Sequence, residues 1–186
     1  MLLLALDVGN TQTVVGLYDL AAADDPNRTR RLADSDLVDH WRIATNVERT
    51  ADEHALVLQE FLGFHGSSWD DNDIQGIAVC SSVPRVTGSL RRMSERYFGL
   101  PALVVEPGVR TGLPVLYDNP KEVGADRIAD AVAAFDLYGG PTIVVDFGTA
   151  TTFEAISAKG EYLGGAIFPG IDVSLDALFN RAAALR

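Results

Sequence analysis

Two short segments of the chain carry residues suited to phosphate chemistry. Segments 7–13 and 146–152 share the pattern D-x-G-x-x-x-T and align without a gap. Glycine lets a backbone approach a ligand closely, and a turn of small polar residues presents N–H groups and hydroxyls to phosphate oxygens. An aspartate at a strand end is suited to a cation that bridges phosphates. One copy is typical of an ordinary turn, whereas two equivalent copies favour a site that binds a phosphate chain from both sides.

A third candidate is the segment Gly124-Ala125-Asp126-Arg127, which stands at the start of a predicted helix. Transfer of a phosphoryl group to an alcohol needs a base that accepts the hydroxyl proton, and a carboxylate can serve. An adjacent arginine can bind an anionic acceptor through paired hydrogen bonds. An acidic residue in the first turn of a helix is also common on ordinary surfaces. Its place between the two loops favours the functional interpretation, and the residues alone leave both open.

Hydrophobic periodicity and turn residues predict an α/β chain around these segments. In the first part the predicted order is strand, strand, strand, helix, strand, helix, strand, which is typical of a mixed sheet with helical crossovers. Thr50 and Glu53 form a predicted capping box at the start of the first helix. The predicted strands cover 2–6, 13–18, 37–43, 74–80 and 102–105, the second helix covers 86–98, and 21–35 is a predicted flexible loop.

The second part repeats the beginning of the first. A helix is predicted over 122–138, strands over 142–146, 151–156 and 161–167, and a further helix from residue 171. Duplication of a strand–turn–strand unit indicates two related domains that face each other. We therefore predict a first domain over 1–118 and a second, incomplete domain over 119–186.

The composition excludes several classes of partner. The formal net charge of −11 opposes binding to nucleic acid and to anionic membranes, although local N–H groups and a cation can still hold ATP. The single cysteine, Cys80, permits neither an intrachain disulfide nor a cysteine zinc cluster. The apolar start of the chain lacks the basic flank of a signal peptide and is too short to span a membrane, so we expect a cytoplasmic protein.

Taken together, the motifs resemble those of one family, the type III pantothenate kinases. The resemblance covers nearly the whole chain, and it is specific because the pieces occur jointly and in order. The segments that carry it are 7–11, 117–120, 124–127 and 146–152, with additional likeness at 40–45 and 164–170.

This resemblance implies an α/β chain of the actin/hexokinase-like (ribonuclease H-like) fold with duplicated domains. It also implies an ATP-dependent kinase that transfers the γ-phosphate of ATP to the 4′-hydroxyl of pantothenate, the first step of coenzyme A biosynthesis. The implied cofactors are ATP, Mg²⁺ and a monovalent cation, K⁺ or NH₄⁺. The implied partner is pantothenate, and the full-length form is expected to be a homodimer.

The resemblance also assigns roles to individual positions. Asp126 is the expected general base, Asp146 is the expected ligand of the monovalent cation, and Asp7 is expected near Mg²⁺. The expected ATP-binding residues are Asp7, Val8, Gly9, Asn10, Thr11, Gln12, Thr13, Val14 and Thr149. The expected pantothenate-binding residues are Tyr117, Gly124, Ala125, Asp126 and Arg127.

Two departures from the family accompany the match. The 21–35 loop is longer than the usual turn, and family members continue beyond the position where this chain stops. We therefore expect a C-terminal truncation, exposed sheet edges and apolar helix faces in the second domain, and low stability or activity of this chain alone. Two alternatives stay open: a kinase of the same superfold acting on a sugar or a carboxylic acid, and an inactive truncated paralogue. Release of ADP with and without pantothenate and potassium separates them.

Overall fold

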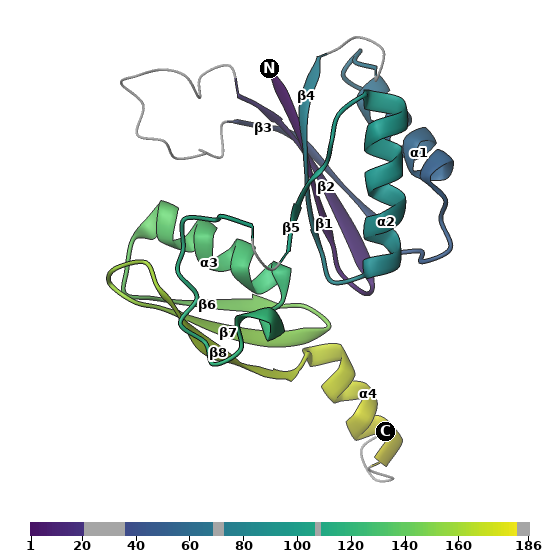
Figure 1. Cartoon of the computed structure of the whole chain (residues 1–186). Coiled ribbons are helices and arrows are strands. Elements are labelled where there is room, and N and C mark those ends of the chain that lie inside the picture. The colour runs from purple at the N-terminus through teal and green to yellow at the C-terminus, as the bar shows by residue number, and fades with distance from the viewer. Residues whose placement is uncertain (21–35, 69–72, 107–108, 182–186) are drawn as a thin grey trace. The chain divides into compact units, whose positions relative to one another are not determined.

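A computed structural model describes residues 1–20, 36–68, 73–106 and 109–181. The chain divides into two units, Met1–Val109 and Arg110–Arg186, each of which is described by itself (Figure 1). The segment before α3 packs with the second unit, because the N–H of Leu116 donates to the Tyr162 carbonyl and the N–H of Tyr162 donates to the Pro114 carbonyl, both at 2.8 Å. The domain boundary between residues 118 and 119 stays a prediction.

The first unit is built on a five-stranded sheet of order β3-β2-β1-β4-β5. β1 pairs antiparallel with β2, and β2 with β3, while β4 runs parallel to both β1 and β5. Alternate residues of the central strand β1 are buried, which places Leu4, Leu6 and Val8 in the core. The strands are β1 (Leu2–Val8), β2 (Gln12–Asp19), β3 (Leu37–Ala44), β4 (Ile74–Ser81) and β5 (Leu103–Val105). The predicted order of elements is confirmed; the predicted 21–35 loop lies outside the described residues.

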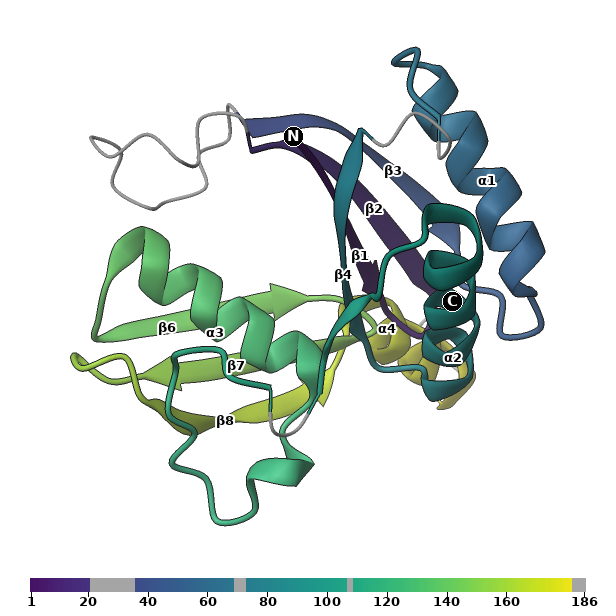
Figure 2. The same ribbon diagram turned by 45° about the horizontal axis from the view of Figure 1, so that its top comes forward.

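Two helices, α1 (Ala51–Gly63) and α2 (Pro84–Met93), lie side by side against this sheet (Figures 1 and 2). Their apolar faces join the strands in one core, to which Leu58 and Leu90 contribute fully buried side chains. A π-helical segment, Ser94–Phe98, extends α2 and ends at Gly99, whose φ of 64° is left-handed. Glycine adopts that conformation without steric cost, so the helical segment ends at Phe98, where the sequence predicts its end.

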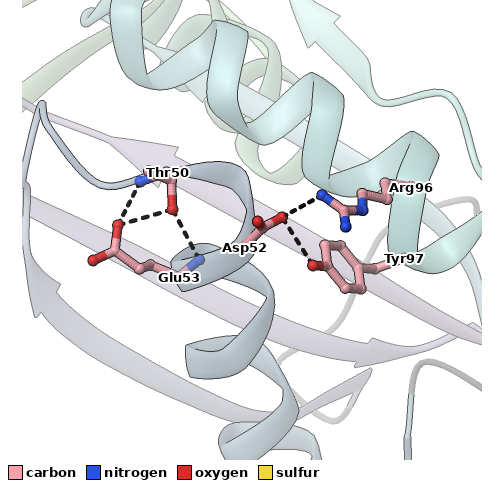
Figure 3. Close-up of polar contacts among 5 residues, drawn as sticks. All are labelled: Thr50, Asp52, Glu53, Arg96 and Tyr97. Carbon is pink, nitrogen blue, oxygen red and sulfur yellow. Dashed lines mark hydrogen bonds and ion pairs between the residues drawn. The ribbon is translucent and has the colours of Figure 1, made fainter.

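Side-chain contacts order the beginning of α1 (Figure 3). The Thr50 hydroxyl accepts from the Glu53 N–H, and the Glu53 carboxylate accepts from the Thr50 N–H at 2.7 Å, which confirms the predicted capping box. Asp52 accepts hydrogen bonds from Arg96 and from the Tyr97 hydroxyl, both at 2.8 Å. The Asp52 bond raises the pKa of Tyr97, and the bonds from Thr50 lower the pKa of Glu53. The Asp52 contacts tie the first turn of α1 to the π-helical segment that extends α2.

The second unit is a three-stranded antiparallel sheet of order β6-β7-β8 with α3 packed against it (Figure 2). A short 3-10 turn, Pro120–Glu122, precedes α3, and α4 continues from the end of β8. The bounds are α3 (Ala125–Tyr138), β6 (Thr142–Phe147), β7 (Ala150–Ile156), β8 (Tyr162–Pro169) and α4 (Ile171–Arg181). Within the described ranges, no helix is both long and apolar enough to span a membrane.

The core of the second unit is small. Its buried apolar residues are Leu113, Val123, Ala131, Ile156 and Tyr162. Large apolar side chains of the strands and of α4 are exposed, among them Ile143, Phe147 and Phe179 at 64%, 70% and 51% of their surface. The expected exposure of an apolar helix face is therefore observed at α4, while the expected exposure of sheet edges stays a prediction.

Candidate active site

The first predicted phosphate loop joins β1 to β2. Val8 pairs with Thr13 across the hairpin, and the N–H of Gly9 donates to the Gln12 carbonyl at 3.0 Å. The polar side chains of Asp7, Asn10, Thr11 and Gln12 are exposed around this turn. The chain thus presents a short polar turn at the end of the central strand, as the sequence predicts.

Thr45, the residue that follows β3, fixes the shape of this loop. Its N–H donates to the Thr11 carbonyl at 3.0 Å, and its hydroxyl donates to the Gly9 carbonyl at 2.7 Å. The same hydroxyl lies 2.9 Å from the Thr13 hydroxyl. One residue therefore joins three points of the loop, two of them through its side chain. Sequence reasoning gave Thr45 no role, because the contact spans two hairpins and has no local signal.

Two of the expected ATP-binding residues point their side chains into the core instead of the turn. Val8 is 1% exposed and Thr13 is 2% exposed. The Val8 carbonyl accepts from the N–H of Ser82 at 3.0 Å and from its hydroxyl at 3.2 Å. Any contact of Val8 or Thr13 with a phosphate must therefore use the backbone.

The second loop joins β6 to β7 and contains Thr149, and Asp146 lies near the end of β6; both residues are exposed. The N–H of Gly148 donates to the Ala150 carbonyl at 3.0 Å, and the N–H of Gly170 donates to the Thr149 carbonyl at 2.9 Å. A Cβ at Gly170 would lie 2.5 Å from that carbonyl oxygen. Only glycine lets the backbone after β8 approach the loop this closely.

The two loops differ in length, which corrects the gapless alignment. Val8 pairs with Thr13 in the first hairpin, whereas Phe147 pairs with Thr151 in the second. The second loop is thus one residue shorter, and Thr151, not Thr152, is the counterpart of Thr13. A shift of one residue moves a strand side chain to the opposite face of the sheet. The letters of the motif match, but the register after the turn does not.

The third candidate segment forms the beginning of α3. Gly124 is the N-cap, Ala125 is the first helical residue, and the N–H of Arg127 donates to Asp126 Oδ1 at 2.9 Å. A Cβ at Gly124 would overlap the exposed Asp126 carboxylate. Glycine is therefore required for this carboxylate to fold back over the helix start.

Tyr117, the remaining expected substrate residue, lies beside β8. A Cβ built on Gly164 would lie 3.4 Å from the Tyr117 ring, so the ring packs against this glycine. The φ of Gly164 is 122°, a conformation that other residues rarely adopt. Tyr117 is 42% exposed, which leaves part of the ring for a ligand.

Arg127 takes part in a buried polar cluster that the sequence did not reveal. Arg127 Nε donates to Glu154 Oε1 at 2.7 Å, and the Tyr162 hydroxyl donates to Glu154 Oε2 at 2.5 Å. The hydrogen bond with Glu154 raises the pKa of Arg127. Burial, reinforced by the bond to Glu154, raises the pKa of Tyr162. The guanidinium therefore stays positive, and the phenol stays neutral.

The described residues contain no group of three or more histidine, cysteine, aspartate or glutamate side chains placed to hold a metal ion. A pocket of about 770 Å³ lies beside the start of α1 and contains none of the expected site residues. Its charged lining includes Arg85 and Glu48, which pair with each other while about two thirds of each side chain remains exposed.

The predicted site residues are divided between the two units. Asp7 belongs to the first unit, and Tyr117, Asp126 and Asp146 belong to the second.

The fold has known counterparts among solved structures. A Ppx/GppA phosphatase of Aquifex aeolicus superposes with a TM-score of 0.53 at 17% identity, over 97% of this chain and 55% of that one. An activator of 2-hydroxyisocaproyl-CoA dehydratase from Clostridium difficile, solved with ADPNP, gives 0.51 at 12% identity, over 91% and 46%. The chain has the actin/hexokinase-like α/β fold that the sequence predicts.

Sequence comparison gives the family. The model of the type III pantothenate kinase family matches residues 3–186. Curated type III pantothenate kinases of Streptomyces avermitilis and Thermobifida fusca are 56% and 52% identical, over 100% and 99% of this chain. The chain spans 66% of the length of each. These matches extend through both loops and the start of α3, and the chain belongs to the type III pantothenate kinase family.

Proposed function

We propose that the protein transfers the γ-phosphate of ATP to the 4′-hydroxyl of pantothenate and so begins coenzyme A biosynthesis. The observation that carries this proposal is the start of α3, where Asp126 is exposed and Arg127 is held in its charged form by Glu154. A carboxylate and a fixed cation on adjacent residues are suited to an acceptor that carries both a hydroxyl and a carboxylate. Pantothenate has both groups.

In this proposal the two loops bind the phosphates of ATP. The backbone of 8–14 and the exposed side chains of Asn10 and Thr11 serve the first loop, and Thr149 serves the second. Backbone N–H groups of tight polar turns bind phosphate oxygens without a strongly positive overall field. This mode of binding is compatible with the net charge of −11.

One aspartate carboxylate is available as a ligand for each of the two proposed cations. Mg²⁺ is commonly held by one or two carboxylates together with substrate phosphates, and Asp7, at the end of β1, offers one carboxylate. Asp146 occupies the matching place at the end of β6 and offers oxygen ligands to K⁺ or NH₄⁺. When bound, these cations offset the negative charge of the phosphates during transfer.

The residues at the start of α3 act on the acceptor. The hydroxyl oxygen of pantothenate attacks the γ-phosphorus, the hydroxyl proton passes to the Asp126 carboxylate, and the bond to the β-phosphate oxygen breaks to release ADP. Arg127 binds the acceptor carboxylate, while Tyr117 and the backbone of Gly124 and Ala125 line its path. We further propose a homodimeric, cytoplasmic enzyme.

The test is ADP release by the complete protein, measured with and without pantothenate and with K⁺ replaced by Na⁺. We expect activity that depends on pantothenate, and a loss of about 10²- to 10⁴-fold in kcat for Asp126→Asn. Asp136→Asn is the matched control, because Asp136 is exposed on the same helix, away from its start. If the rate of ADP release does not depend on pantothenate but increases with a sugar or another acid, the proposal is overturned and the protein is another kinase of this superfold.

A further inference from the structure

Glu154 is a carboxylate in the interior of the second unit. It lies in β7, and its side chain is 0% exposed. A buried carboxylate is costly unless hydrogen bonds replace its lost hydration. Both of its oxygens are bonded, Oε1 to Arg127 Nε and Oε2 to the Tyr162 hydroxyl. Glu154 therefore has defined partners on both sides and no freedom to rotate.

The partner guanidinium is correspondingly fixed. The Arg127 side chain is 13% exposed, and its central carbon lies 5.9 Å from the centroid of the Tyr162 ring. Glu154 engages Nε, and Nη2 is buried without a hydrogen-bond partner among the described residues. An unpaired buried donor is unfavourable. The arrangement thus holds an arginine in place while leaving one of its NH₂ groups in need of an acceptor.

The neighbouring strand makes room for this pair. Gly165 in β8 is the cross-strand partner of Glu154. A Cβ at Gly165 would lie 2.5 Å from Arg127 Nη2 and 2.8 Å from Glu154 Oε2. A glycine inside a strand weakens the sheet and often marks a close approach of another group. Here the Phe153 carbonyl oxygen approaches most closely, and the guanidinium and the carboxylate take up the space beside it.

Stability alone is a poor explanation for the cluster. Replacing a buried ion pair by well-packed apolar side chains is often neutral or stabilising, so such a pair is weak support for a purely structural role. The surroundings of this ion pair also contain Gly165 inside a strand and the unpaired Nη2 donor of Arg127, and both features lower the stability of a fold. Arg127 directly follows Asp126, whose Oδ1 accepts from the Arg127 N–H.

We propose that Glu154, supported by Tyr162, is a positioning residue that fixes the Arg127 guanidinium beside Asp126 for the carboxylate of the acceptor. The inference rests on the proposed function, because it takes Arg127 to bind that carboxylate. Glu154 does not touch the substrate and acts through Arg127. Its loss should therefore affect recognition of the acceptor and leave the binding of ATP intact.

The first variant is Glu154→Gln in the complete protein. It preserves shape but removes the charge that orients Arg127, and we expect KM for pantothenate to rise about tenfold or more. We expect KM for ATP to change by less than about twofold, since Glu154 acts on Arg127 and Arg127 is not among the residues proposed to bind ATP. The control is Glu106→Gln, which alters an exposed arginine–glutamate pair, Arg91–Glu106, whose atoms are 2.8 Å apart. It should change neither constant.

A second variant covers the case in which Glu154→Gln does not fold. Tyr162→Phe keeps the buried ring and removes only the hydroxyl that supports Glu154, so we expect a smaller rise in KM for pantothenate, about threefold. Glu154→Gln should add nothing further in an Arg127→Gln background, because both changes act on one group. An analogue whose carboxylate is replaced by a hydroxymethyl group should respond to neither Glu154→Gln nor Tyr162→Phe.

The outcomes separate this inference from the proposed function. If the unmodified protein uses pantothenate but Glu154→Gln and Tyr162→Phe leave its KM unchanged, the positioning role is overturned and the function stands. Equal increases in both KM values also overturn the positioning role, since they indicate a general loss of structure. If the unmodified protein shows no pantothenate-dependent release of ADP, both proposals fail.

Discussion

The two loops that we propose to bind phosphate reach the same hydrogen-bond pattern by different chemical means. In each unit, the residue that follows the third strand of the hairpins, β3 or β8, donates its N–H to a loop carbonyl. Thr45 donates to Thr11, and Gly170 donates to Thr149. Thr45 adds two side-chain contacts, whereas Gly170 adds none and leaves no room for a Cβ. The first loop is therefore held by a side chain and the second by close packing of backbone.

The difference shows how a duplicated unit can diverge while its backbone pattern persists. The second loop is one residue shorter, and its carbonyls leave no space for a Cβ on Gly170, the residue that follows β8. The shorter loop accepts only glycine there, and the longer one has room for a threonine. The two loops should consequently fail in different ways when the holding residue is changed.

The largest effect is expected for Gly170→Ala. Its Cβ would meet the Thr149 carbonyl oxygen at 2.5 Å and the carbonyl carbon at 2.8 Å, neither of which can move without the loop. Overpacking of this kind costs about 3 kcal/mol. Hydrogen exchange should show lost protection of the Gly148 and residue 170 amides. Gly63→Ala is the control, because nothing lies within 4 Å of its Cβ and the site is helical. Unchanged protection in Gly170→Ala would contradict close backbone packing.

A second contrast concerns the titratable group that each unit buries. The second unit buries Glu154 in an ion pair with Arg127, whereas burial in the first unit lowers the pKa of His54 to about 4, with Arg49 adding to the effect. The unfolded pKa is about 6.5. The stabilisation is thus complete above that value and is lost as the pH falls toward 4, with about 2 kcal/mol lost between pH 7 and pH 5.

Tryptophan fluorescence during denaturant unfolding measures this loss, since both tryptophans, Trp41 and Trp69, fall in the first unit. His54→Leu should remove most of the pH dependence in that range. If the slope persists in His54→Leu, another group is responsible.

Thr45→Val should have an intermediate effect that isolates the side-chain contribution to the first loop. It keeps the shape and the N–H bond to Thr11 but removes the hydroxyl contacts to Gly9 and Thr13, at a cost of about 1–2 kcal/mol. We expect weaker binding of ATP, measured by titration calorimetry, and recovery in Thr45→Ser. Thr87→Val is the control, because it removes a single helical bond to the Val83 carbonyl. Equal ATP affinities in Thr45→Val and Thr87→Val would contradict a specific role of the Thr45 hydroxyl in holding the first loop.

The smallest effect is expected at the N-terminal cap of α1. Because this cap lies outside both loops, its variant measures how much ATP affinity changes when only the stability of the first unit is lowered. Thr50→Ala removes the hydroxyl that accepts from the Glu53 N–H and should destabilise the first unit by about 1 kcal/mol, without altering ATP affinity. Denaturant unfolding and calorimetry measure the two quantities. A loss of ATP affinity as large as that of Thr45→Val would show that the loop responds to any weakening of the unit.

The sequence by itself determined the elements and the family. Alternating apolar residues mark the strands because one side of each faces a core, and the turn and cap residues Gly99, Thr50 and Glu53 act through local backbone geometry. These signals are local, so the element order and the capping box follow from them. The chemical candidates Asp7, Asp126 and Asp146 also stand out locally, and their roles remain predictions.

Only the tertiary structure decided what holds those candidates in place. The bonds that Thr45 donates to Gly9 and Arg127 donates to Glu154 join residues 36 and 27 positions apart, so no local pattern predicts them. The register that pairs Thr13 with Val8 but Thr151 with Phe147 depends on loop length, which motif letters do not encode. The need for glycine at positions 165 and 170 likewise appears only in the structure, where backbone carbonyls occupy the space of each missing Cβ and the Arg127 guanidinium also lies close at Gly165.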